Sequence, residues 1–163
     1  DEIEAAIPSL RRYAHALMRD RDAADDLVQD SLERALSRRH LWRGDGPVRA
    51  WMFRILLNLH RDGLRQTPRR HLVAVESLLK EPAGPERQEA HMDLREVQAA
   101  IGRLPDDQRR ALLLVALEGM SLAEAATLLD IPEGTLVSRL GRSRAALREM
   151  TGRTAPQKKE GRA

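Results

Sequence analysis

Hydrophobic residues recur every three or four positions along most of this chain, the spacing that places them on one face of an α-helix. In the first 66 residues the spacing predicts three helices, over about 3–19, 22–39 and 47–65. A loop is expected before the third helix, because two glycines and a proline fall within four positions there.

The hydrophobic spacing breaks after residue 66. The turn-forming residues of this stretch are Pro68, Pro82, Gly84 and Pro85. Because no apolar period survives among them, we expect a flexible interdomain linker over 67–90. The apolar segment 72–75 is compatible with a short strand, but no partner strand is near it in the sequence, so a coil or one helical turn is favoured.

The helical spacing resumes at Leu94 and predicts four more helices. Their approximate ranges are 94–104, 106–118, 121–129 and 133–150. A tight turn is expected at 130–132, between the last two helices, because it contains a proline. The polar residues 151–163 predict a disordered tail.

Individual residues predict where some of these helices begin and end. Asp22 and Asp106 are expected N-caps. Gly119 is expected to end a helix. Ser121 and Glu124 have the spacing of a capping box, in which each side chain accepts a hydrogen bond from an N–H at the start of the same helix.

The pattern therefore predicts an all-α fold. It consists of two small, independently packed helical domains, 1–66 and 91–150, joined by the flexible linker. The length of 163 residues suits two small domains, and aromatic residues, at 2%, are too few to favour strands. The sequence does not indicate whether the two domains pack against one another.

The composition excludes several classes of protein. Charged residues make up 33% of the chain and no apolar run is long enough to span a membrane, so no membrane insertion is expected. The first residues lack the features of a secretion signal, which favours an intracellular, cytoplasmic protein. Without cysteine there are no disulfides, thiolate nucleophiles or cysteine-bound metals.

No motif for enzymatic chemistry is present. The sequence has no phosphate-binding glycine loop, no zinc-protease motif and no nucleophile elbow, and its five histidines never stand at metal-ligand spacing. We therefore expect no catalytic site, no metal and no cofactor.

The charges of the predicted helix 22–39 are unevenly distributed. Its acidic residues, with the aspartate before it, are Asp20, Asp22, Asp25, Asp26, Asp30 and Glu33, and basic residues follow at Arg34, Arg38, Arg39 and Arg43. Such a cluster is either a solvated helix face or a binding surface for a basic partner. The chain has 25 arginines against 3 lysines, and arginine suits contacts with phosphates and base edges.

Residues 121–148 have the pattern of a helix-turn-helix. A short capped helix with two small alanines, a three-residue turn and a longer helix entered by Gly134-Thr135 follow one another. In such motifs the second helix presents its N-terminal residues to base edges. An ordinary helical hairpin with solvated arginines is the alternative.

Together these segments resemble the extracytoplasmic-function group of bacterial sigma factors, in order and spacing over nearly the whole chain. They are DAADDLVQD (22–30), VRAWMFRILLNL (48–59) with Asp62, Leu104-Pro105, SLAEAA (121–126) and PEGTLVSRL (132–140). The resemblance implies two helical domains that bind core RNA polymerase and direct it to promoter DNA, without chemistry of their own. It also implies control by an anti-sigma factor.

The resemblance assigns two surfaces to the first domain. The helix 22–39 is expected to dock on the clamp helices of the polymerase's largest subunit, where its carboxylates can meet arginines. The implied contact residues are Asp25, Asp26, Leu27, Gln29 and Asp30.

The loop 40–47 and the next helix are expected to read the promoter −10 region and hold an extruded base. The implied residues are Trp42, Arg43, Arg49, Asn58 and Asp62. Trp51, on the apolar stripe, is expected in the core.

The resemblance assigns the helix from residue 133 to the promoter −35 element. The implied residues are Thr135, Val137, Ser138, Arg139, Gly141, Arg142 and Arg144. Four of them face the bases, namely Val137, Ser138, Gly141 and Arg142, and Arg139 and Arg144 lie nearer the phosphates. Arg142 is the best candidate for a bidentate guanine contact. Val137 and Gly141 depart from the residues common in the family, so the DNA sequence that is read cannot be transferred from other members.

Two other functions remain open. An autonomous helix-turn-helix regulator would use residues 121–148, but this function would not explain the acidic helix 22–39. A sigma-like decoy would sequester an anti-sigma factor. Such decoys are usually fused to a receiver domain, for which a chain of 163 residues is not expected to leave room.

Overall fold

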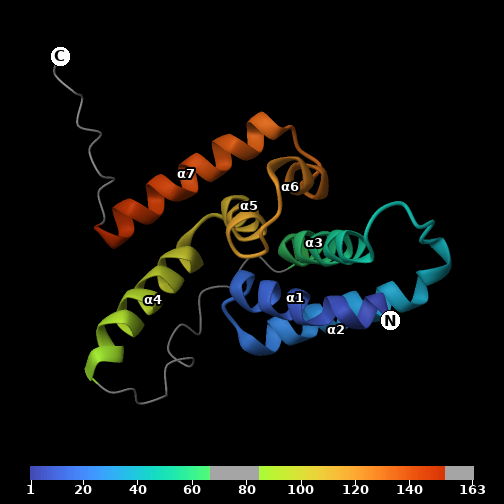
Figure 1. Ribbon diagram of the computed structural model, residues 1–163, viewed down its shortest axis with the longest axis horizontal. Coiled ribbons are helices and arrows are strands. Elements are labelled where there is room, and N and C mark those ends of the chain that lie inside the picture. Colours follow the sequence, from blue (N-terminus) through green and yellow to red (C-terminus); the bar gives the residue numbers. More distant parts are fainter. Residues whose placement is uncertain (67–84, 153–163) are drawn as a thin grey trace.

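The structure is a computed structural model that describes residues 1–66 and 85–152. Most of the expected linker, including the segment 72–75, and nearly all of the expected tail lie outside the described residues. Within the described ranges every regular element is a helix, as the hydrophobic spacing predicts. Figure 1 shows α1, α2 and α3 gathered on one side of the molecule, α4 and α7 on the other, and α5 and α6 between them.

The N-terminal helices form a three-helix bundle in which α1, α2 and α3 each contact the other two. Their bounds are α1 Glu2–Leu17, α2 Arg21–Ser37, the short 3-10 helix η1 Arg39–Leu41 and α3 Val48–Gln66. The N-cap of α2 is Asp20, whose side chain accepts a hydrogen bond from the Asp22 N–H at 3.0 Å. The expectation that Asp22 is the cap was therefore wrong, because α2 begins at Arg21, so Asp22 lies inside the helix and the cap lies two residues before it.

The C-terminal helices are α4 Pro85–Arg103, α5 Asp106–Ala116, α6 Leu122–Leu129 and α7 Glu133–Thr151. α4 begins within the range expected to be linker, since Pro85 suits the first turn of a helix. Asp106 is the first residue of α5, whose N-cap is Pro105 without a side-chain hydrogen bond, so Asp106 is not the expected cap. α7 continues to Thr151, one residue into the expected tail, and ends at Gly152.

The predicted ends of α6 are confirmed. Ser121 and Glu124 form the capping box, with the Glu124 N–H donating to the Ser121 hydroxyl at 3.1 Å and the Ser121 N–H donating to the Glu124 carboxylate at 2.9 Å. After α6, Asp130 adopts the left-handed conformation, with φ of 54°, which turns the chain into α7. The helix-turn-helix predicted from the sequence is thus present.

The two groups of helices pack against one another. α1 contacts α5 and α4, and α3 contacts α6. The buried side chains form a single hydrophobic cluster that runs from Leu10 and Leu56 on one side to Leu114 and Leu136 on the other. The expectation that the two domains pack independently was therefore wrong, because apolar side chains of α1 and α3 share one core with those of α5 and α6.

Candidate functional surfaces

The acidic surface of α2 is partly exposed and partly paired. Asp26, Gln29 and Asp30 are exposed, whereas Leu27 is only 9% exposed and belongs to the core. Asp25 accepts a hydrogen bond from His15 of α1 at 2.9 Å, so it also joins α2 to α1. Of the five residues assigned to polymerase contact, three are therefore exposed.

The residues assigned to the −10 region begin in the loop before α3. Gly44 and Gly46 have φ of 77° and 88°, a conformation that glycine adopts without strain, so the loop turns sharply here. Arg43 is exposed, and Trp42 is half-buried with its ring centroid 6.4 Å from that of Trp51. Trp51 is also half-buried and packs against the core, in line with its expected structural role.

Helix α3 does not bring its three assigned residues to one face. Asn58 and Asp62 are one turn apart and both exposed, with Asn58 accepting a hydrogen bond from Arg61 at 3.4 Å. Arg49 precedes Asn58 by nine residues, which at about 100° per residue turns it to the opposite side of the helix. Arg49 there faces the C-terminal helices.

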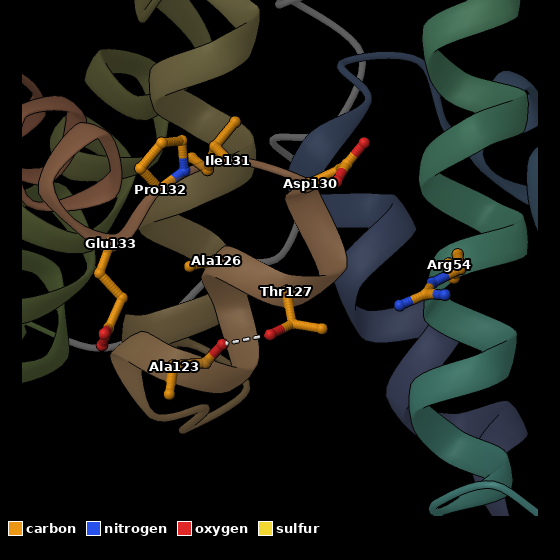
Figure 2. Close-up of a pocket in the computed structure, with 8 residues that line it drawn as sticks. All are labelled: Arg54, Ala123, Ala126, Thr127, Asp130, Ile131, Pro132 and Glu133. Atoms are coloured by element: carbon orange, nitrogen blue, oxygen red, sulfur yellow. Dashed lines mark hydrogen bonds between the residues drawn. The ribbon is translucent and has the colours of Figure 1, made fainter.

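The turn of the helix-turn-helix lies across a pocket from α3. Figure 2 shows Arg54 of α3 extending toward Thr127 and Asp130 from the other side of this pocket. The Thr127 hydroxyl donates to the Ala123 carbonyl at 2.9 Å, which keeps that side chain against its own helix. The pocket exists because the two groups of helices are packed together.

The outward face of α7 carries the residues assigned to base contacts. Leu136, Leu140 and Ser143 are buried and anchor one side of the helix. The four residues on the opposite side are exposed, namely Val137, Ser138, Gly141 and Arg142. This division follows from the period of 3.6 residues per turn, and Val137, at 52% exposed, is apolar without being part of the core.

The flanking positions of α7 differ in their freedom. Arg139 is half-buried and pairs with Asp107 of α5 at 3.7 Å. Thr135 and Arg144 are exposed. A Cβ atom added to Gly141 would meet nothing within 4 Å, so packing does not require glycine there. The missing side chain leaves a shallow depression at the centre of the outward face.

A charged cluster at the junction of the two groups was not predicted from the sequence. The side chain of Glu118, which follows α5, is 0% exposed and lies between Arg12 of α1 and Arg49 of α3. Arg12 donates to it from Nε at 3.1 Å and from Nη2 at 2.8 Å. Arg49 donates from Nη2 to the carboxylate at 2.7 Å and to the Glu118 carbonyl at 3.3 Å. The hydrogen bond to Glu118 raises the pKa of Arg12 above its ordinary value.

Two further contacts cross the same junction. The buried Tyr13 hydroxyl donates to the Arg110 carbonyl of α5 at 3.0 Å, and burial raises the pKa of this tyrosine. Arg109, only 7% exposed, donates to the Leu17 carbonyl of α1 at 2.9 Å. Burial lowers the pKa of Arg109, which the nearby Asp106 carboxylate partly offsets. No signal in the sequence identifies these residues, because their partners are distant along the chain.

Comparison with known proteins identifies the two groups of helices separately. Residues 3–57 match the family model of the Sigma2 domain of PhyR, and residues 94–147 match that of Sigma-70 region 4. The chain is 41% identical over 147 residues to the ECF RNA polymerase sigma factor EcfG of Rhodopseudomonas palustris, covering 90% of this chain and 81% of that protein. The chain belongs to the ECF sigma factors.

Other members of the ECF sigma family agree with this assignment. The chain is 33% identical to SigM of Mycobacterium tuberculosis, covering 88% of this chain and 71% of that protein. Its fold matches the sigma factor RpoE of Bartonella quintana, solved with the anti-sigma factor NepR, with a TM-score of 0.75, 32% identity and coverage of 93% and 94% of the two chains. Sigma factors are not enzymes; they act through the polymerase that they bind.

None of the described helices of this ECF sigma factor is long and apolar enough to cross a membrane. Among the described residues, no three side chains that ligate metals gather in one place.

Proposed function

We propose that this ECF sigma factor binds core RNA polymerase through the exposed part of α2 and directs it to promoters that it reads with α3 and α7. The observation that supports this most strongly is that one chain carries a Sigma2 match and a region 4 match in that order. We propose that residues 1–66 bind the polymerase and the −10 region and that residues 91–150 bind the −35 element. Residues 67–90 connect the two.

The polymerase contact is proposed for Asp25, Asp26, Gln29 and Asp30. Three of these side chains are exposed, and carboxylates and an amide in such a row suit a partner surface rich in arginine. Leu27 supports the contact indirectly, by fixing α2 on the core beneath them.

The −10 contact is proposed for the loop and for the exposed end of α3. Trp42 offers an aromatic surface to an unstacked base, Arg43 offers a charge to the backbone, and Asn58 and Asp62 share one exposed face. Arg49 is also a candidate, but its guanidinium is bound to Glu118 in this arrangement of the helices.

The −35 contact is proposed for α7 as in other helix-turn-helix proteins. Val137, Ser138, Gly141 and Arg142 form the outward face that enters the major groove. Thr135, Arg139 and Arg144 flank this face, where they can reach phosphates.

Control by an anti-sigma factor is proposed from two solved relatives. RpoE of Bartonella quintana is bound to the anti-sigma factor NepR, and CnrH, 28% identical with a TM-score of 0.65, is bound to the cytosolic domain of CnrY. We place this chain in the cytoplasm, where core polymerase acts.

Transcription with purified components tests the proposed function. We expect the chain to bind Rhodopseudomonas palustris core polymerase and to drive specific transcription from promoters selected with it out of a pool of random −10 and −35 sequences. The Asp26→Lys/Asp30→Lys variant should lose this activity, whereas Glu96→Gln, a change at an exposed residue of α4, should keep it. If the wild-type chain neither binds core polymerase nor stimulates specific transcripts, the proposal fails.

A decoy for an anti-sigma factor is the second candidate, because the Sigma2 match is to the corresponding domain of PhyR. An anti-anti-sigma factor PhyR is solved with NepR, and it shares the fold with this chain at 18% identity. A decoy would bind NepR but would leave transcription by core polymerase unchanged. The transcription experiment therefore separates the two functions.

A further inference from the structure

The Glu118 cluster has the composition of an occupied anion site. Two guanidinium groups from different helices of the N-terminal bundle converge on one carboxylate, and that carboxylate comes from the C-terminal helices. A guanidinium fork binds a carboxylate and a phosphate with the same geometry. Arg12 and Arg49 would therefore remain as a pair of cations if Glu118 were withdrawn.

The surroundings hold both arginines in place. The Arg49 guanidinium carbon lies 5.2 Å from the Phe53 ring centroid, and Phe53 meets Tyr13 edge to face with centroids 5.3 Å apart. These aromatic rings belong to α1 and α3, so they stay with the arginines when the two groups of helices separate. The side chains of Arg12 and Arg49 are 52% and 38% exposed, which leaves both accessible from solvent.

Glu118 reaches the arginines because the chain turns sharply behind it. Gly119 has φ of 67°, and the N–H groups of Glu118 and Met120 donate to the Leu113 and Leu114 carbonyls at 3.1 Å each. This turn fixes the carboxylate at the end of α5. The other contacts across the junction, from Tyr13 and Arg109, hold the same face closed.

We propose that Arg12 and Arg49 form a phosphate-binding site for promoter DNA, and that Glu118 occupies this site while the two groups of helices are packed together. This rests on the proposed function, because it supposes that the chain meets DNA beside the −10 loop. DNA is favoured as the ligand since Arg49 lies in the first turn of α3, directly after that loop. Separation of the helices would expose the pair and allow a phosphate to replace the carboxylate.

The experiment measures binding of the free sigma factor to a short, fluorescein-labelled single strand of mixed sequence, because phosphate contacts do not depend on base sequence. Glu118→Gln removes the competing charge and weakens the closed form. Loss of the charged hydrogen bonds between Glu118 and the two arginines should raise the affinity for the strand about tenfold. This value corresponds to the lower end of the range for hydrogen bonds to charged groups, because both arginines are partly exposed. Glu96→Gln, with the same change of charge on exposed α4, should bind as the wild type does.

Two further variants identify the site and the mechanism. Adding Arg12→Ala to Glu118→Gln should remove most of the gain and reduce the salt dependence of binding by about 0.7 units, the value for one phosphate contact on a single strand. Tyr13→Phe leaves both arginines and Glu118 intact but removes the bond to Arg110. It should raise affinity about threefold, and it serves if the Glu118 variant does not fold.

Opening can be followed directly because the sequence has no cysteine. Spin labels on Glu4→Cys and Glu149→Cys, at exposed positions of α1 and α7, should report a longer and broader distance distribution in the Glu118→Gln background. An unchanged distribution and unchanged DNA affinity in folded Glu118→Gln protein would overturn the proposal.

The remaining outcomes also decide the matter. A gain in affinity that survives Arg12→Ala overturns the assignment of the site, and stronger competition by polyglutamate than by unlabelled DNA overturns DNA as the ligand in favour of an acidic protein. If the proposed promoter function fails, no variant will drive transcription by core polymerase, yet the DNA measurement still reports on Arg12 and Arg49. Transcription by the wild type with no effect of Glu118→Gln on DNA binding overturns only this inference.

Discussion

Replacement of Arg109 by methionine is expected to lower the free energy of unfolding by about 2–4 kcal/mol, although the residue lies outside every proposed contact surface. Its guanidinium donates to the carbonyls of Leu17 and Leu104 and to the carboxylate of Asp106, each at 2.9 Å. The two carbonyls lie at the C-terminal ends of α1 and α4, where helix dipoles favour a positive charge. One buried side chain therefore joins three helices.

The magnitude follows from the groups left behind. Methionine keeps most of the apolar stem of Arg109 but leaves two carbonyls and one carboxylate without this donor. An unsatisfied buried acceptor costs about 1–3 kcal/mol. The substitution also has a favourable effect, because burial of the charged guanidinium costs desolvation free energy. The same desolvation lowers the pKa of Arg109, and its removal offsets part of the loss. The balance of these effects gives the expected 2–4 kcal/mol.

Thermal and urea unfolding of the free protein measure this effect. For a chain of this size the expected fall in Tm is about 5–15 °C. Arg103→Met is the matched control, because Arg103 is an exposed arginine in the last turn of α4, and its loss should cost at most about 1 kcal/mol. If Arg109→Met lowers the Tm no more than Arg103→Met, the hydrogen bonds across the junction do not hold the helices together, and the reasoning is refuted.

Three further predictions concern the proposed surfaces and the helix that supports one of them. Asp30→Lys should weaken binding to core polymerase at least tenfold in a fluorescence titration while leaving the Tm unchanged, because its side chain is exposed; a fall in Tm with normal affinity would make the residue structural. Ser121→Ala should lower the free energy of unfolding by about 1 kcal/mol in urea by removing the capping box of α6, and a neutral effect would contradict the role of the cap. Arg142→Ala should cost about 1–3 kcal/mol on the cognate −35 duplex and little on a scrambled one, whereas Arg144→Ala should weaken both duplexes equally and lower the salt dependence by about one unit. Equal losses from both arginine variants on both duplexes would mean that Arg142 does not read bases.

The helices, their order and the family could all be predicted from the sequence alone. Periodic hydrophobic residues specify an amphipathic helix through neighbours three and four positions away, so each helix could be located from its own segment. The capping box at Ser121 and Glu124 is equally local, since both partners lie within one helical turn. Cap assignments failed at Asp22 and Asp106, because the apolar stripe did not fix where each helix begins: Asp20 caps α2, and Pro105 precedes α5 without a side-chain hydrogen bond.

The pairing of charged residues and the contact between the two groups of helices could not be predicted, because both depend on how distant segments pack. Glu118 binds Arg12 and Arg49, which are 106 and 69 residues away in the sequence. In a chain with 25 arginines and 25 acidic residues, composition offers many such pairs and selects none. The packing of α1 and α3 against α5 and α6 determines which pair forms, because it removes water from the Glu118 carboxylate. A buried carboxylate must then have an opposite charge at hydrogen-bonding distance.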